Sequence, residues 1–571
     1  MNSFMHDLTS ARAALLYAIP LLYLLAAIIP TLIPAASLNP LAPALARCWS
    51  WARRVTGLCV LLAFISTLWL AMSGPSIWPG VTWLPLGEWG ALTSGIRSDA
   101  LSCIVLLLVA FIGWIIVGYS QTYLAGEPRQ AGYIRALLLT LAAVSIVIIT
   151  NNLLMLALAW LATSLALHQL LMFYSDRRPA QIAAHKKFLA SRLADICIFS
   201  AIALIGVSLG TLEISEVLTR VTALSTSTLP VALQIAAALI ALTALLKCAQ
   251  LPLHGWLIQV MEAPTPVSAL LHAGVVNLGG FVLIRLAVLI SEAPLAQTLL
   301  VVVGSITAVV AALVMMTRIS IKVMLAWSTC AQMGFMLMQC GLGAYEMALL
   351  HLVAHSLYKA HAFLGAGGAV EQARLRQMTS TAPASSLGVS LLSAIAGLGM
   401  VAAAAYVWNI QPFALPTAPA LLVLAAIVSL ALTMLIAPLL TVRNSTSSLL
   451  NWGALVLLAS TFSVALAYFG LHYVFSMLVD LPIHAGTTPV AYGLIIFTLV
   501  CFALLFLIQS LIRANPAGKV ARRLYPWFYN GLYLDPLFTR ITFQVWPVKA
   551  PSADKNKAGN IKNNPPSGVT Q

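Results

Sequence analysis

Long apolar runs, each bounded by polar or charged residues, follow one another along almost the whole chain. A transmembrane helix needs roughly 20 predominantly apolar residues, and we count about 15 runs of this kind. They lie approximately at 11–34, 54–73, 99–123, 133–150, 152–173, 189–209, 231–250, 265–290, 296–316, 320–342, 344–370, 385–408, 418–440, 449–471 and 488–512. The pattern predicts an all-α polytopic membrane protein with about 15 transmembrane helices. It leaves no loop long enough for a soluble enzymatic domain.

The segment 247–285, KCAQLPLHGWLIQVMEAPTPVSALLHAGVVNLGGFVLIR, interrupts this regular pattern. Lys247 ends an apolar run, and Pro252 removes a backbone donor five residues later, which breaks the helix. Two further prolines open a second apolar helix that carries His272. Irregular backbone at membrane depth must be buried in protein or line water, and a charge there is expensive and commonly functional. The segment therefore predicts the interior of an ion transporter.

The composition supports the membrane class. The chain is 61% hydrophobic and only 8% charged, whereas soluble domains carry about 25% charged residues. The apolar stretch 13–33 exceeds the roughly 7–15 residues of a signal-peptide core, so we interpret it as the first transmembrane helix. The eight cysteines form no C-x-x-C pair, which favours packing roles over a metal or redox site. No cofactor is expected in this chain.

The net charge of +15 has an uneven distribution along the chain. Most lysines and arginines, including Lys186 and Lys187, fall in predicted loops after odd-numbered spans. The N-terminus and the loops after even-numbered spans hold about four: Arg12, Arg97, Arg220 and Arg285. This asymmetry follows the positive-inside rule and predicts an external N-terminus and a cytoplasmic C-terminus in a bacterial inner membrane. The basic excess is therefore topological, and we expect no nucleic-acid partner.

Three titratable residues share one face of the predicted eleventh helix. His351, His355 and Lys359 are spaced i, i+4 and i+8, so they stack along that face. Histidine titrates near neutral pH, and a row of such groups can pass protons along through intervening water. The stripe predicts a proton relay, with Ser328, Thr329 and Gln332 of the preceding span as polar partners. A lone histidine such as His361 is equally well explained by a hydrogen bond to a neighbouring helix.

Few acidic residues lie near these groups. Asp195 is either part of an ion pair with Arg192 at the cytoplasmic edge or the counter-ion of Lys247. Glu262 lies in the helix break, as a surface residue or as a gate, and His254 either caps the broken helix or gates the entry. Lys186 completes the set of counter-ion or gating candidates.

The motif KCAQLPLHGWL followed by APTPVSALLHAG resembles the proton-conducting antiporter-like family of membrane subunits. That family includes subunit L (chain 5) of complex I, the large subunits of Mrp antiporters and the membrane subunit of the Dab inorganic-carbon transporter. The segments AAHKKFLASRLAD, IKVMLAWSTCAQMGFM, LHLVAHSLYKAHAFLGAG and ARRLYPWFYNGLYLDPLF resemble further parts of the family, in order. The resemblance implies two inverted five-helix repeats, here spans 4–8 and 9–13, each with a discontinuous helix. It implies ion-translocation roles for Lys247, His272, His351, His355 and Lys359.

The departures from the family pattern favour its Dab members. Leu161 stands where complex I and Mrp members carry a glutamate, the twelfth span has no charge, and the long lateral helix of subunit L is absent. The resemblance then implies a subunit that conducts protons, or sodium ions, and is not itself an enzyme. It would work with a cytoplasmic zinc-binding subunit similar to a β-carbonic anhydrase, in which ion flow drives CO2 hydration to bicarbonate. The alternatives are a subunit of a complex I-like or hydrogenase-like redox pump, and an Mrp-type sodium/proton antiporter subunit.

These predictions divide the chain into four parts. Residues 1–125 form the N-terminal transmembrane helices, and 126–440 form the antiporter-like core. Residues 441–550 form the C-terminal transmembrane helices and an amphipathic aromatic segment, and 551–571 form a disordered tail. Aromatic side chains rimmed by charge often mark an interface, so the aromatic segment and the basic loops predict the docking surface for the cytoplasmic partner.

Overall fold

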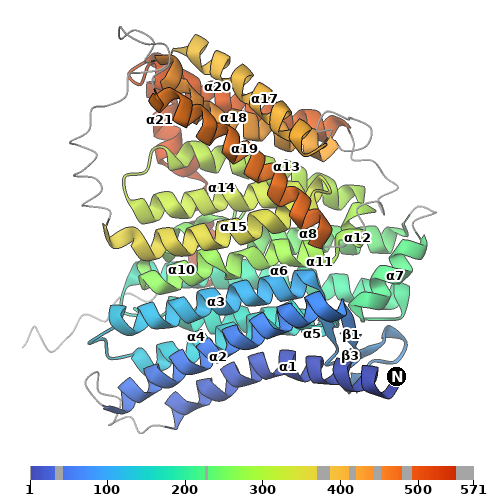
Figure 1. Cartoon of the computed structure of the whole chain (residues 1–571). Helices are drawn as coiled ribbons and strands as arrows, with labels where there is room; N and C mark the ends of the chain where they lie inside the picture. The colour runs from blue at the N-terminus through green and yellow to red at the C-terminus, as the bar shows by residue number, and fades with distance from the viewer. Residues whose placement is uncertain are drawn as a thin grey trace, which may run out of the picture.

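The protein is a stack of long helices that run side by side, with two short strand pairs at one end (Figure 1). The computed structural model describes residues 2–32, 43–224, 229–368, 386–410, 419–441, 452–478 and 492–547. The predicted all-α polytopic class is confirmed. The predicted disordered tail, 551–571, lies outside the described residues.

The N-terminal helices form one side of the stack. They are α1 (Asn2–Ile28), α2 (Pro43–Ser73), α3 (Ala100–Tyr123), α4 (Gln130–Ile149), α5 (Leu153–Leu171), α6 (Arg178–Leu209) and the short α7 (Ile214–Leu224). Strand β1 (Ser76–Trp78) pairs antiparallel with β4 (Ile96–Ser98), and β2 (Thr82–Pro85) with β3 (Ala91–Thr93). We call the side of the protein where the helices end next to these strands the strand end (Figure 1). There Asn152 begins α5 by accepting hydrogen bonds from the backbone of Leu154 and Met155, both at 3.1 Å.

The central helices are broken in two places. Helix α8 (Val231–Lys247) ends where Ala249 adopts a left-handed backbone (φ 53°), as the proline nearby predicts. The chain then forms α9 (Gly255–Gln259), a 3₁₀ turn at Val260–Glu262, and α10 (Thr265–Ala273). The predicted span 265–290 matches a segment, Thr265–Arg285, that is long and apolar enough to cross a membrane. A second 3₁₀ turn, Val275–Asn277, interrupts it between α10 and α11 (Leu278–Arg285), and α12 (Ala287–Ser291) follows. Helices α13 (Pro294–Met315), α14 (Ile321–Gly341) and α15 (Tyr345–Leu364) complete this part.

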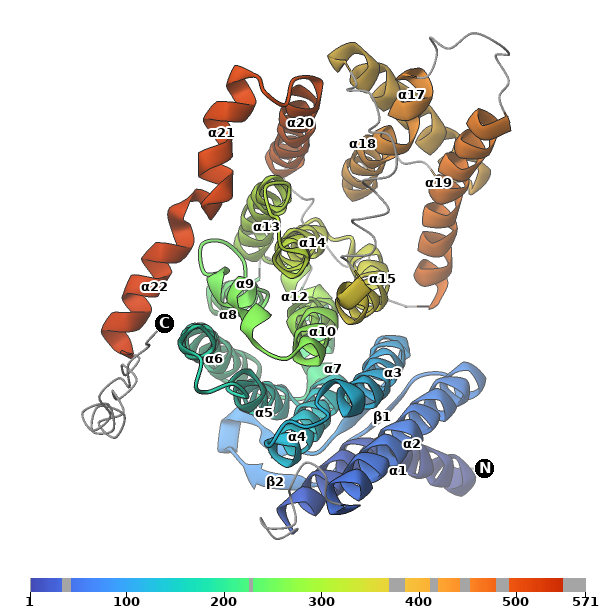
Figure 2. The same cartoon turned by 90° about the vertical axis from the view of Figure 1, so that its left-hand side faces the viewer.

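The remaining helices form a less buried group and a surface segment. The group contains α17 (Leu387–Val407), α18 (Pro419–Thr441), α19 (Trp452–Leu478) and α20 (Tyr492–Ala514). Helix α17 is continuous over its described residues, so the break expected in the second repeat is not seen there. Helices α21 (Lys519–Tyr529) and α22 (Leu534–Val545) run along the edge of the bundle past α20, α13, α8 and α6 (Figure 2). We call residues 519–545 the C-terminal strap.

Thirteen helical segments of the described chain are long and apolar enough to cross a membrane. Two more helices coincide with predicted spans but fall outside that set. Helix α8 has 17 residues because the break shortens it, and α15 carries Glu346, three histidines and Lys359 within its 20 residues. The protein is thus multi-pass, and the predicted number of 15 spans is not confirmed.

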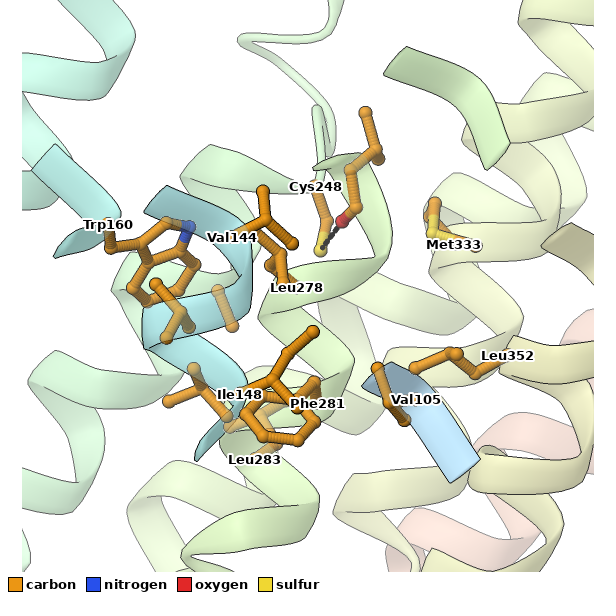
Figure 3. Packing of buried hydrophobic residues seen from close by; sticks show 14 of the residues in the cluster. Val105, Val144, Ile148, Trp160, Cys248, Leu278, Phe281, Leu283, Met333 and Leu352 are labelled. Carbon is orange, nitrogen blue, oxygen red and sulfur yellow. Dashed lines mark hydrogen bonds between the residues drawn. The ribbon is translucent and has the colours of Figure 1, made fainter. Parts of the chain in front are cut away.

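The apolar core surrounds the second helix break. Trp160, Phe281, Leu278 and Met333 pack there from α5, α11 and α14 (Figure 3). The thiol of Cys248 donates to the Val276 carbonyl at 3.1 Å, which satisfies one backbone group that the break leaves free. A methyl group on Gly279 would lie 2.4 Å from that sulfur, so only glycine allows the two broken helices to approach this closely.

Candidate ion-translocation site

A buried ion pair lies at the end of α8. Lys247 Nζ donates to Asp195 Oδ1 at 2.7 Å, and the two side chains are only 7% and 8% exposed. The other carboxylate oxygen of Asp195 lies 2.7 Å from Arg192, although the angle is outside the range of a hydrogen bond. The two predicted partners of Asp195, Arg192 and Lys247, therefore both contact it in the structure. Lys247 also lies 4.5 Å above the ring of Trp160, a cation–π distance.

A small polar cavity adjoins this pair. Its volume is about 20 Å³, and Ser164, Lys187 and Lys247 are among the residues that line it. Lys187 donates to the Ser164 carbonyl at 2.6 Å and to its hydroxyl at 2.8 Å. A polar space of this size accommodates about one water molecule. Lys187 and Lys247 thus both line a space that can hold about one water molecule.

Removal of the carboxylate at this pair should impair transport. For the inorganic-carbon uptake that the resemblance implies, we expect Asp195→Asn to lower bicarbonate accumulation several-fold, because among the described residues Lys247, Lys187 and Arg192 would then form no ion pair with any other acid. Leu161→Glu should also lower it, since a second carboxylate beside Trp160 would hold the proton on Lys247. Accumulation of labelled inorganic carbon in cells measures both effects.

Asp176→Asn is the matched control, because Asp176 is an exposed aspartate whose only described ion pair is with Arg129 at 3.5 Å. It should behave like the unaltered chain. Wild-type accumulation by Asp195→Asn, at equal amounts of protein in the membrane, would remove Asp195 from the path.

The second cluster brings α10 and α15 together. The rings of His351 and His355 are 5.8 Å apart, and His272 of α10 stacks on Phe363 of α15 with ring centroids 4.4 Å apart. His272 and Lys359 have no exposed surface, and Lys359 donates to the Leu325 carbonyl at 3.0 Å. Among the described residues no carboxylate lies within 4 Å of Lys359. The predicted histidine–lysine stripe is thus assembled on one face, and its role in ion movement stays a prediction.

Buried polar atoms without a partner continue from one cluster to the other. They are Ser268 Oγ, both ring nitrogens of His272, Asn277 Oδ1 and His355 Nε2. Between them Asn277 donates to the Ser356 hydroxyl at 2.7 Å, across 79 positions of sequence. Buried polar groups usually bind protein or ordered water, so these atoms are places where ordered water can bind within the apolar core. Asn277 and Ser356 were missed in the sequence, where the only signal was a polar residue within an apolar run.

A wider cavity lies beside the histidines. It has a volume of about 400 Å³ and is lined by Ser328, Gln332, His351, His355 and Tyr468, among others. Gln339 lies 3.1 Å from His351 Nδ1, a hydrogen bond that fixes the ring. Thr329 instead donates to the Leu325 carbonyl within its own helix. His361 is exposed on another face of α15.

The lysines before the sixth span are placed differently from the prediction. Lys186 and Lys187 were expected in a cytoplasmic loop, but α6 begins at Arg178, and the two residues are 0% and 4% exposed. Both can be buried because each ammonium group binds a polar group of another helix. Lys187 donates a hydrogen bond to Ser164 of α5, and Lys186 forms an ion pair with Asp535 of α22 at 2.7 Å. The prediction that Lys186 and Lys187 lie in a loop is therefore wrong.

The remaining gating candidates lie near the C-terminal strap. His254 is fully buried, its Nδ1 is 3.2 Å from the Pro252 carbonyl, and its ring centroid is 4.8 Å from that of Trp327. Asp535 of the strap contacts this region too, since Gln259 donates to it at 2.9 Å. Glu262 is partly exposed in its 3₁₀ turn and pairs with no cation among the described residues. The strap thus covers the broken segment from outside.

Two family models match the sequence. The model described as NADH:quinone oxidoreductase/Mrp antiporter, TM, matches residues 150–406. The model for the N-terminus of complex I chain 5 matches residues 83–134. The first match contains both Lys247 and Lys359 with the residues around them.

Curated relatives cover most of the chain. The probable inorganic carbon transporter subunit DabB of Hydrogenovibrio crunogenus is 42% identical over 82% of this chain and 86% of its own length. The probable inorganic carbon transporter subunit DabB2 of Halothiobacillus neapolitanus is 37% identical over 88% and 90% of the two chains. NADH-quinone oxidoreductase subunit L of Mycobacterium tuberculosis is 35% identical, over 51% of this chain and 45% of its own length.

Solved structures share the fold. A chain of the Mrp complex from Dietzia sp. superposes with a TM-score of 0.60 at 24% identity, covering 95% of this chain and 61% of that one. The archaeal membrane-bound sulfane sulfur reductase gives 0.53 at 18% identity, over 92% and 99%. The fold and the broken helices define an antiporter-like membrane subunit. The chain belongs to the family of the probable inorganic carbon transporter subunits DabB.

Proposed function

We propose that this chain conducts protons, or sodium ions, as the membrane subunit of an energy-coupled inorganic-carbon uptake complex in a bacterial inner membrane. The observation that carries the proposal is the buried pair of Lys247 and Asp195 at a helix break. A lysine held by a carboxylate, beside a cavity the size of one water, can exchange a proton with Lys187. No bulk water is needed for that step.

The path continues from this pair through the core to α15. We propose that water held by Ser268 and Asn277 carries the proton from Lys247 to His272, and that His355 passes it on to Lys359 or to His351. The cavity beside His351 then supplies the exit, since α17 carries no charged side chain that could act in its place. Breaks in α8 and α10–α11 support this proposal, because irregular backbone at such depth is tolerated where it lines water or protein.

The carbon chemistry belongs to another subunit in this proposal. The names of the DabB relatives describe a subunit of a transporter. We propose that its partner here is a cytoplasmic zinc-binding subunit resembling a β-carbonic anhydrase (DabA-like). Ion flow through this chain would drive one-way hydration of CO2 to bicarbonate in that partner, which would carry the zinc.

The C-terminal strap is the proposed docking surface. Tyr525, Trp527 and Tyr533 are each about half exposed, at 51%, 55% and 52%. Arg177 and Arg178 lie exposed at the start of α6, and Arg178 is 6.0 Å from the ring of Phe543 in the strap. Large aromatic side chains rimmed by arginine are typical of protein interfaces. Lys186 and Lys187, which were expected to contribute, are buried and are removed from this surface.

Purification from native membranes should bring down a zinc-bearing subunit in about equal amount with this chain. The purified chain alone should contain no stoichiometric zinc. Combined Trp527→Ala and Tyr533→Ala substitutions should reduce the amount of partner, because both remove exposed aromatic area from the strap. Subunit staining and metal analysis of the same eluate provide the measurement.

Trp83→Ala is the matched control, since Trp83 is even more exposed, at 69%, but belongs to β2 at the strand end. It should retain the partner. Recovery of quinone-reductase subunits alone would favour a redox pump instead. A redox pump is the second candidate function because about half of the chain is similar to subunit L. Recovery of small membrane subunits alone would favour the Mrp-type antiporter.

A further inference from the structure

A large cavity opens near the strand end, away from both clusters of the ion path. Its volume is about 750 Å³, and it is bounded by α2, α3, α7, α11, α12 and the last turn of α19. Helix α19 crosses the stack obliquely, and its C-terminal end reaches the region of α12 (Figure 1). Most of the wall is apolar, with Leu70, Ile104, Val288 and Met477 among its residues.

An ion cluster forms one edge of this cavity. Asp99 accepts from Arg97 Nε at 2.7 Å and also from the Nη1 group of Arg285. Arg285 is almost fully buried and donates its other terminal nitrogen to Ser102. The side chain of Arg97 is 25% exposed, and its two terminal nitrogens make no hydrogen bond to a described residue. Arg97 therefore presents a free guanidinium edge to the cavity.

The charge on this edge is unbalanced. The charged residues that line the cavity are Arg97, Arg285 and Asp99, which sum to one positive charge. Glu213, which directly precedes α7, does not line the cavity. Its carboxylate accepts hydrogen bonds from Thr93, Asn151 and Asn152. The free edge of a guanidinium binds phosphate through two parallel hydrogen bonds. The edge therefore carries one positive charge that no charged residue of the cavity lining balances.

The shape of the cavity selects the kind of anion. Its volume falls within the roughly 300–1,000 Å³ of sites for sizeable organic ligands and is far more than a small inorganic anion needs. One polar edge and a long apolar wall match an amphiphile with a charged head. An arginine at the polar edge can bind the phosphate of such a molecule while the apolar wall packs against its hydrocarbon.

We propose that this cavity binds an anionic phospholipid, with the phosphate on Arg97 and the acyl chains along Leu70, Ile104 and Met477. The site is independent of the ion path and of the proposed carbon chemistry. It would fix the end of α19 against α2 and α12 through a lipid.

The test is lipid binding by the purified full chain, together with any subunit that accompanies it. After delipidation in mild detergent, native mass spectrometry follows binding of phosphatidylglycerol, phosphatidylcholine and glycerol phosphate. Phosphatidylglycerol should bind about tenfold more tightly than phosphatidylcholine, and Arg97→Gln should abolish that preference. Arg220→Gln is the matched control, since Arg220 is exposed on α7, pairs with Glu216 and does not line the cavity.

A second variant keeps the test decisive if Arg97→Gln fails to fold. Ala71→Trp fills the apolar wall and leaves the cluster of Asp99, Arg97 and Arg285 intact. It should lower phosphatidylglycerol binding about tenfold as well. Equal binding by both variants and the unaltered chain would overturn the proposal. Displacement of the lipid by glycerol phosphate alone would overturn it in favour of a soluble anion, and equal binding of phosphatidylcholine would exclude selection for charge.

Discussion

Replacement of Lys247 by alanine is expected to abolish bicarbonate accumulation, while the chain still inserts into the membrane in normal amount. The proposed proton path loses its central carrier, because among the described residues Asp195 forms an ion pair with no other lysine. The fold tolerates the change, since Asp195 keeps Arg192 at 2.7 Å and is not left as an unpaired buried charge. Growth at ambient CO2 and uptake of labelled inorganic carbon measure the loss.

Lys247→Arg separates proton transfer from simple charge balance. Arginine preserves the positive charge beside Asp195 but does not release its proton in proteins. We therefore expect Lys247→Arg to insert normally and to fail in uptake almost as completely as Lys247→Ala. Full growth at ambient CO2 with the alanine variant would refute a relay role for Lys247.

Lys359→Ala is expected to reduce transport almost as far as replacement of His351, His355 and Lys359 together. The three side chains lie on one stretch of α15, and His355 interacts with both of the others. Groups that act in series on one path give strongly non-additive losses, because the first break already stops the flow. Uptake by the single, double and triple variants, at matched protein levels, measures the coupling.

His361→Ala provides the control on the same helix. His361 is exposed on another face of α15 and should have little effect on uptake. Partial losses that simply add from one variant to the next would indicate separate structural roles for the three residues instead of one path.

Local sequence signals predicted the parts of the site that depend on neighbouring residues. Pro252 and Lys247 lie five positions apart, so the end of α8 and its charge could be recognised together. The i, i+4, i+8 spacing of His351, His355 and Lys359 is a property of one helix and needs no tertiary information. The same holds for the membrane class, which depends on the apolar runs alone.

Long-range contacts account for what the sequence did not predict. Lys186 pairs with Asp535 across 349 positions, so no local pattern could indicate that it is buried. The break between α10 and α11 has no proline; Gly274, with φ −128° and ψ −71°, interrupts the helix where Cys248 packs against Val276. A methyl group on Gly255 would lie 1.6 Å from Asp535 Oδ1, so the position of the strap also depends on a glycine 280 residues away.

The central claim is that ions cross the membrane through Lys247. Its most direct test uses the purified complex in sealed proteoliposomes, with a proton gradient or a sodium gradient imposed across the bilayer and CO2 supplied on the partner's side. The unaltered complex should dissipate one of the two gradients when CO2 is added, and the Lys247→Ala complex should dissipate neither. Dissipation by Lys247→Ala at the rate of the unaltered complex would contradict the account.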